Sequence, residues 1–153
     1  MLVNENLKKL NIEIPKPPDP VGAYVAYKKT SNLLFISGQI SIDANGNITK
    51  GKLGKELSID QGQAAAKLSA INIIAQAKKA CDEKLETIRN CIKLTGYVNS
   101  TNDFNDQPKV INGASEIISA VFGENGKHTR SAISANSLPL GAAVEVDAIF
   151  ELK

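Results

Sequence analysis

The sequence has 153 residues, of which 42% are hydrophobic and 22% charged. This composition is typical of a globular protein, and the length favours a single domain. The formal net charge is +2, from 18 basic and 16 acidic residues, and aromatic residues are limited to three Tyr and four Phe. Because dedicated nucleic-acid binders usually carry a basic stripe interleaved with aromatic side chains, these numbers argue against that class of partner.

The N-terminal sequence lacks the apolar core of a secretory signal, and no run approaches the ~20 apolar residues needed to span a bilayer. Cys81 and Cys91 have no metal-ligand spacing, and His128, the single histidine, cannot complete a Cys/His zinc site. The two cysteines are expected to be small buried hydrophobes. We therefore predict a reduced, cytoplasmic protein with no metal site and no membrane association.

Residues 1–20 are predicted to be an N-terminal arm, and residues 21–153 a single domain. The segment NENLKKLNI, residues 4–12, predicts either a short amphipathic helix or a loose tail. The cluster PKPPDP, residues 15–20, predicts a stiff extended segment, because proline fixes φ and biases the preceding residue away from helix.

Residues 22–29 and 32–40 are rich in β-branched and aromatic residues and are separated by turn formers, which predicts a hairpin. The turn sequence DANGN follows, and then a candidate strand around Ile48. Ser58 and Gln61 form a capping box that starts a helix of about two dozen residues. Its expected apolar stripe consists of Leu68, Ile71, Ala75 and Lys78, with Ala64 and Ile74 beside them.

Residues 87–98 predict a further strand. A second helix is expected to start at Asp106, with Pro108 in its first turn, and to end at Gly123. Residues 129–135 and 142–152 predict two last strands. The order β-β-(β)-α-β-α-β-β indicates an α+β fold with two helices packed on one face of a sheet. The apolar stripe of the second helix is expected to comprise Val110, Ile111, Ala114, Ile118 and Val121.

The last two strands carry the charged residues of greatest interest. Glu145 and Asp147 share the face opposite the apolar residues of the final strand, while Arg130 shares a face with the small residues Ala132 and Ser134. If these strands are antiparallel neighbours, Arg130 lies near Asp147 or Ala148, and Glu145 lies about 7–10 Å away. That spacing suits a small anion held between Arg130 and Glu145, and it suits a structural Arg130–Asp147 ion pair equally well.

Two blocks of the sequence resemble the YjgF/RidA (reactive intermediate deaminase, "endoribonuclease L-PSP") family. HTRSAISANSLPLGAAVEVDAIFEL resembles its C-terminal signature, and VGAYVAYKKTSNLLFISGQISID resembles its N-terminal block. The resemblance covers residues from about 20 to 152. It implies a chorismate-mutase-like α+β fold with a mixed sheet, assembled as a homotrimer with ligand clefts between subunits. It also implies hydrolysis of enamine/imine intermediates, such as 2-aminoacrylate, to 2-keto acids and ammonia.

The resemblance assigns site residues by position. Arg130 matches the carboxylate-binding arginine, and Glu145 matches the strand glutamate that orients or activates water, so these two are the candidate catalytic residues. Tyr24, Asn112, and the Ser37–Gly38 pair match positions that line the ligand cleft. The expected partners are a small carboxylate-bearing ligand and further copies of this chain, and no cofactor is needed because an imine carbon is already electrophilic.

The sequence departs from the family pattern at several points. Ala132 stands where a cysteine is frequent, Ala23 replaces a proline, and His128 and Thr129 replace a Pro-Ala pair. Imine hydrolysis needs no nucleophilic side chain, so the missing cysteine is tolerable. Two alternatives remain open: a binding module that holds small 2-keto acids without turnover, and an endoribonuclease, which would require a second base and a basic face. His128 is expected to be a surface or loop residue.

Overall fold

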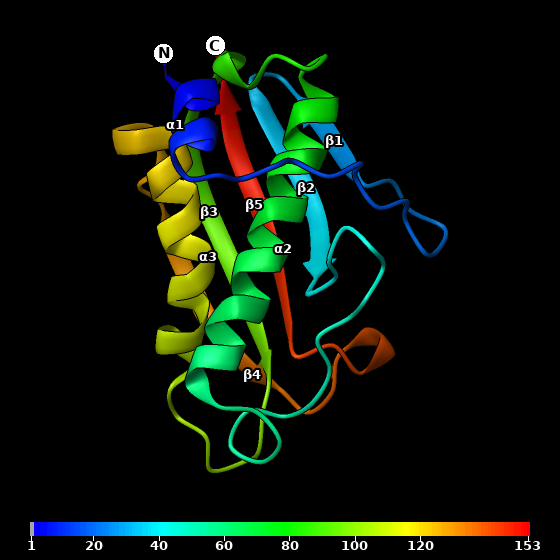
Figure 1. Cartoon of the computed structure of the whole chain (residues 1–153). Helices are drawn as coiled ribbons and strands as arrows, with labels where there is room; N and C mark the ends of the chain where they lie inside the picture. Colours follow the sequence, from blue (N-terminus) through cyan, green and yellow to red (C-terminus); the bar gives the residue numbers. More distant parts are fainter. Residues whose placement is uncertain (1) are drawn as a thin grey trace.

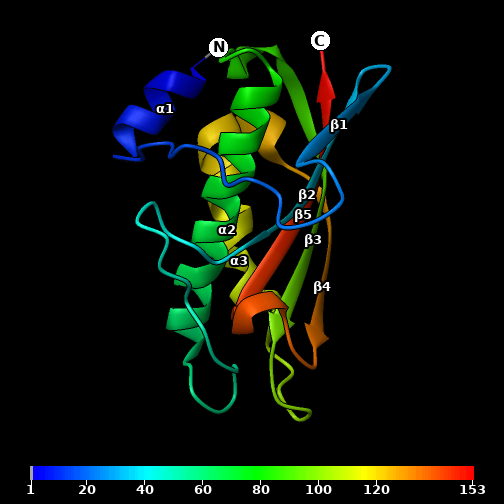
Figure 2. The ribbon, with the colours of Figure 1, turned by 90° about the vertical axis from the view of Figure 1, so that its right-hand side faces the viewer.

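The computed structural model describes residues 2–153 and contains one five-stranded sheet covered on one face by helices (Figures 1 and 2). The elements, in chain order, are α1 (Val3–Lys9), β1 (Tyr27–Thr30), β2 (Leu33–Ile40), α2 (Ile59–Ala80), β3 (Ile88–Asn99), α3 (Gln107–Phe122), β4 (Thr129–Ala135) and β5 (Val144–Leu152). Short 3₁₀ turns lie at Leu85–Thr87, Gly123–Gly126 and Pro139–Gly141. The predicted α+β class is confirmed.

The sheet has the strand order β1-β2-β5-β3-β4. It is mixed, because β3 and β4 are parallel while the other neighbouring pairs are antiparallel. Direct antiparallel pairing of β4 with β5, the condition for placing Arg130 near Asp147, does not occur, because β3 lies between them. The connection β3–α3–β4 is a crossover, which brings β4 back parallel to β3 and leaves it at the edge of the sheet.

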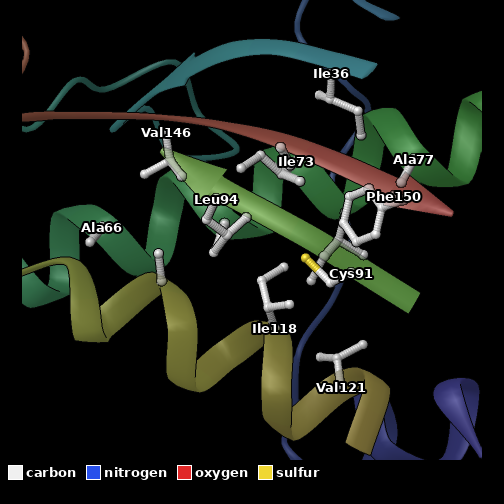
Figure 3. Packing of buried hydrophobic residues seen from close by; sticks show 14 of the residues in the cluster. Ile36, Ala66, Ile73, Ala77, Cys91, Leu94, Ile118, Val121, Val146 and Phe150 are labelled. Atoms are coloured by element: carbon white, nitrogen blue, oxygen red, sulfur yellow. The ribbon is translucent and has the colours of Figure 1, made fainter. Parts of the chain in front are cut away.

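The core lies between the sheet and the two long helices. In Figure 3, Leu94, Val146 and Phe150 of the sheet face Ile73 of α2 and Ile118 of α3. The final strand alternates buried and partly exposed residues as its period-2 pattern predicts. The expected stripe of α3 is also confirmed, because all five of its residues are buried. Cys81 and Cys91 are free and buried, and burial raises the pKa of Cys91 to about 12.

The capping box of α2 forms as predicted: the Ser58 side chain accepts from the Gln61 backbone, and the Gln61 side chain accepts from the Ser58 backbone. The predicted stripe of α2 is right at Ile74 and Ala75, which are buried. It is wrong at Leu68 and Ile71, which are only partly buried, and at Ala64, which is exposed. Small residues form most of the rest of the buried face, because they let the helix approach both the sheet and α3 closely. They include Gly62, Ala65, Ala66, Ser69, Ala70, Ala77 and Ala80.

The first predicted strand is shorter than expected, because residues 21–25 bend and pairing starts only at Tyr27. The strand expected around Ile48 reduces to an isolated bridge between Ile42 and Ile48. The N-terminal helix forms, and its Val3 and Leu7 are buried in the main core. From α1 the chain crosses α2 on its way to β1 (Figure 1). At this crossing the side chain of Gln76, in α2, donates a hydrogen bond of 2.6 Å to Pro18 O.

Gly113 sets the distance between α2 and α3. A Cβ at this position would overlap the backbone carbonyl of Gln63, so Gly113→Ala must push the helices apart. We expect it to lower the free energy of unfolding by about 1–3 kcal/mol in chemical denaturation. Gly62→Ala is the matched control, because its Cβ would meet only the ends of the Leu53 and Val110 side chains. An equal effect of both substitutions would contradict a backbone clash as the cause.

Candidate active site

Arg130 does not face the carboxylates of β5. In the sheet register it pairs with Leu94 of β3, which pairs in turn with Ala148 of β5. Laterally paired residues project to the same face, and Leu94 and Ala148 are buried under the helices. Arg130, Ala132 and Ser134 do share a face, as predicted, but it is the helix face, and the expected approach of Arg130 to Asp147 is wrong.

The guanidinium of Arg130 lies along one stripe of α3. Nη1 donates to Asn112 Oδ1 at 2.8 Å and to Ser115 Oγ at 3.1 Å, and Nη2 donates to Pro108 O at 3.3 Å. With Pro108 as position i, Asn112 and Ser115 are at i+4 and i+7, so the three acceptors follow a single face of the helix. Among the described residues, Nε–H and one N–H of Nη2 have no acceptor. A side-on fork of this kind binds a carboxylate bidentately.

His128 belongs to the same cluster. Its Nδ1 lies 2.6 Å from Gly126 O, and its Nε2 lies 2.9 Å from Ser115 Oγ. A carbonyl oxygen only accepts, so Nδ1 carries the proton, and in the neutral ring Nε2 accepts from the Ser115 hydroxyl. The Ser115 lone pairs then point to Arg130 Nη1. His128 lies in the loop before β4, as expected, but it is half-buried there and holds Ser115, which in turn contacts Arg130.

Glu145 lies on the other face of the sheet, in a cavity of about 600 Å³ that Tyr24, Ser37 and Gly38 also line. A β-bulge in β2 shapes the wall of the cavity next to Glu145. The register between β2 and β5 shifts between Ile36 and Gln39, so two residues of β2 oppose Asp147 alone. The carboxylate of Glu145 lies over Gly38, where a Cβ would overlap its Oε1.

The pKa of Glu145 is raised, first by burial and then by the neighbouring charge of Asp147. Asp147 itself accepts a hydrogen bond from the Tyr97 hydroxyl at 3.3 Å. Burial, followed by the charge of Asp147, also raises the pKa of Tyr97. No basic side chain among residues 2–153 forms an ion pair with Glu145 or Asp147. Glu145 is thus a stronger base than an exposed glutamate.

The predicted site residues therefore form two groups. Arg130 and Asn112 meet at the outer edge of the sheet under α3, whereas Tyr24, Ser37, Gly38 and Glu145 meet in the cavity on the open face. Within one chain the two groups stay apart: β3 separates their strands by about 10 Å, and the charged side chains project to opposite faces.

Three residues of the site escaped the sequence analysis: Ser115, Tyr97 and Asp147 as the partner of Tyr97. Ser115 had a recognisable signal, because it lies three residues after Asn112 and so on the same helix face. Tyr97 had no such signal. Its place beside Asp147 depends on the pairing of β3 with β5, which the sequence does not specify.

Residues 2–153 include no group of His, Cys, Asp and Glu side chains that could hold a metal ion. In the same range, no helix has both the length and the apolar character required to cross a membrane.

Comparison with known proteins gives consistent matches over nearly the whole chain. Residues 5–152 match the family model described as "YjgF/chorismate mutase-like, putative endoribonuclease". Protein TCP17 of Trypanosoma cruzi is 40% identical over 151 residues, which cover 98% of this chain and 94% of that protein.

Solved structures agree. The crystal structure of Atu1372 from Agrobacterium tumefaciens, of unknown function, superposes with a TM-score of 0.93 at 39% identity, covering 99% of this chain and 93% of that one. TdcF of E. coli, solved with bound serine, has a TM-score of 0.65 at 25% identity and covers 90% of this chain and 94% of its own. The matched range, the fold and the identity together show that this chain belongs to the YjgF/chorismate mutase-like family.

Proposed function

We propose that this protein is a cofactor-independent deaminase that hydrolyses 2-imino acids of the 2-aminoacrylate or 2-iminobutanoate type to 2-keto acids and ammonia. The observation that carries the proposal is Glu145, a half-buried carboxylate with a raised pKa at the wall of a cavity. Such a group serves as a general base near neutral pH. The free fork of Arg130 supplies the matching site for the substrate carboxylate.

The proposed active form is a homotrimer. Because one chain keeps Arg130 and Glu145 on different surfaces, a complete site requires Arg130 from one copy and Glu145 from the next. In such an assembly the Arg130 surface of each copy contacts the Glu145 surface of the next. A ring that closes after three copies then contains three equivalent sites. The serine bound to TdcF is a small amino acid with a carboxylate, which is the kind of ligand that Arg130 suits.

The reaction needs only positioning and proton transfer. An enamine first tautomerises to the imine by gaining a proton at its terminal carbon and losing one from its nitrogen. Glu145 then takes a proton from a water molecule as the water oxygen bonds to the imine carbon, and it passes this proton to the imine nitrogen, which gives a tetrahedral aminoalcohol. Transfer of the remaining hydroxyl proton to the same nitrogen lets ammonia leave as the carbon–nitrogen bond breaks and the carbonyl forms. Arg130 keeps the carboxylate, and hence the plane of the imine, fixed throughout.

The family description also names an endoribonuclease. RNA cleavage requires a surface that attracts phosphate, and the lining of the cavity contains two carboxylates, Glu145 and Asp147, against one cation, Lys28. Phosphate would be repelled at this place. The geometry therefore favours the imine reaction over RNA cleavage.

A coupled assay tests the proposal. A serine or threonine dehydratase generates the imine, semicarbazide traps the portion that remains, and keto-acid release is followed with and without this protein. We expect the protein to speed release and to reduce the trapped fraction. Binding of pyruvate or 2-ketobutyrate without any acceleration would instead indicate a binding module, and light scattering that gives a monomer would contradict the shared site.

Gly38→Ala is expected to lower kcat for imine hydrolysis roughly 10²-fold, because the new methyl group must displace the Glu145 carboxylate from its position. The fold is retained, since the change lies at a bulge on the open face, and thermal unfolding checks this. In a double-mutant cycle, Gly38→Ala should add little to a variant that already carries Glu145→Gln. Additive losses would contradict an effect through Glu145.

A further inference from the structure

The structure contains a second cavity of about 420 Å³ that shares Tyr24, Gly38 and Glu145 with the first. It extends from the Glu145 carboxylate away from the open face, along the edge that β2 exposes beyond the end of β1. The proposed reaction requires only the first cavity, so the second has no role in it yet.

The walls of this second cavity are mostly apolar and come from six parts of the chain, two of which are Gln76 of α2 and Glu145 of β5. The N-terminal arm supplies Pro18, Asp19 and Pro20, with Val21 just after it, and the end of β2 supplies Ile40 with Ile42 just beyond it. Ala26 lines it from the segment before β1, and Pro139 and Leu140 close the other side. Pro18, Asp19 and Pro20 of the arm thus form one wall of the cavity, directly before the first block of family resemblance.

Two observations indicate that the cavity is a built feature. Gln76 of α2, which is 1% exposed, anchors the arm by donating to Pro18 O, while its own Oε1 has no partner among the described residues. Leu140 keeps a left-handed φ of 59°, an unfavourable conformation for leucine, and its side chain is 60% exposed at the rim. Leu140 therefore presents an exposed apolar side chain at the mouth of a mostly apolar cavity, where an apolar group of a ligand could contact it.

We propose that this cavity is a side-chain subsite, formed by the arm, which selects 2-imino acids with branched or long apolar side chains over those with a methyl group. The inference rests on the proposed function. With the substrate carboxylate on Arg130 of one copy and the imine carbon beside Glu145 of the next, the side chain of the substrate extends from Glu145 into the second cavity. An isobutyl group there buries three more carbons than a methyl group.

The test compares two imines made by the same L-amino acid oxidase in the presence of catalase, one from alanine and one from leucine. We expect wild-type kcat/KM to be at least tenfold higher for the leucine-derived imine. Ala26→Leu fills the cavity and should remove most of this preference while leaving the alanine-derived rate within about twofold. Ala64→Leu adds the same atoms on the exposed face of α2 and is the matched control.

Leu140→Gly is a second variant, which relieves the left-handed strain and so does not threaten folding. It should reduce the preference for the leucine-derived imine several-fold. Equal rates for the two imines in the wild type, or no selective effect of either variant, would overturn the subsite while leaving the deaminase proposal intact. If neither imine is hydrolysed, the deaminase proposal fails, and the subsite is judged by calorimetric binding of 4-methyl-2-oxopentanoate against pyruvate. Tighter binding of 4-methyl-2-oxopentanoate than of pyruvate, lost in Ala26→Leu, supports the subsite. Equal affinities for the two keto acids overturn it.

Discussion

Glu145→Gln is expected to lower kcat for imine hydrolysis about 10²- to 10⁴-fold, the usual contribution of a general base. Glutamine keeps the size of the side chain but cannot accept the proton of the attacking water. Affinity for 2-ketobutyrate should stay within a few-fold, because the proposed carboxylate contact is made by Arg130. Glu116→Gln, on the exposed face of α3, is the matched control. Retention of more than a third of the wild-type rate would contradict the role of Glu145.

The pH dependence gives an independent check of this role. The base must be ionised, so the rate falls as pH drops through the pKa of Glu145. Because burial and Asp147 raise that pKa above its ordinary 4.5, the acid limb should lie above this value. Asp147→Asn removes a neighbouring negative charge and should shift the limb to lower pH. An unmoved limb in Asp147→Asn would show that another group titrates.

The raised pKa of Glu145 also affects stability. The folded protein holds this proton more tightly than the unfolded chain does, so stability falls as pH rises from 4.5 through the folded-state pKa. Glu145→Gln has no proton to lose and should therefore have a higher Tm than the wild type at pH 7. Below pH 4.5 the wild-type carboxyl is protonated in both states, and the difference in Tm should disappear. A persistent difference would indicate a packing effect instead.

The second large effect is expected for Arg130→Ala, which should lower kcat/KM about 10²- to 10³-fold and abolish measurable binding of 2-ketobutyrate. The reason is the loss of two charge-assisted hydrogen bonds, each to a carboxylate oxygen, at about 1.5–3 kcal/mol apiece. Isothermal titration and initial rates measure the two losses separately. Full binding of the keto acid by this variant would show that the carboxylate binds elsewhere.

Arg130→Lys separates charge from geometry. Lysine keeps the positive charge but has no planar fork, so most of the loss should remain. The other arginine of the chain, Arg89, is exposed and pairs with Glu151 on the opposite strand, and Arg89→Lys is the matched control with no expected effect on turnover. Full activity of Arg130→Lys would indicate that a point charge suffices and would contradict bidentate binding.

Residues with local signals were predicted well from the sequence. The capping box at Ser58, the stripe of α3 and the alternation of β5 depend on contacts between near neighbours, and all three are as expected. The stripe of α2 was predicted correctly at Ile74 and Ala75 but wrongly at Leu68 and Ile71, which lie beside the buried face. Close approach to the sheet and α3 selects small side chains instead, and this requirement comes from the neighbouring elements.

The site shows the same division. The sequence by itself determined the candidate site residues, since Arg130, Asn112, Glu145 and the Ser37–Gly38 pair could be identified from the family resemblance and, for Arg130 and Glu145, from the strand alternation. Only the tertiary structure decided where they lie. The crossover through α3 inserts β3 between β4 and β5, which turns Arg130 toward Asn112 on the helix face and leaves Glu145 on the open face. Strand order depends on how distant segments pack, and a period-2 pattern contains no information about it.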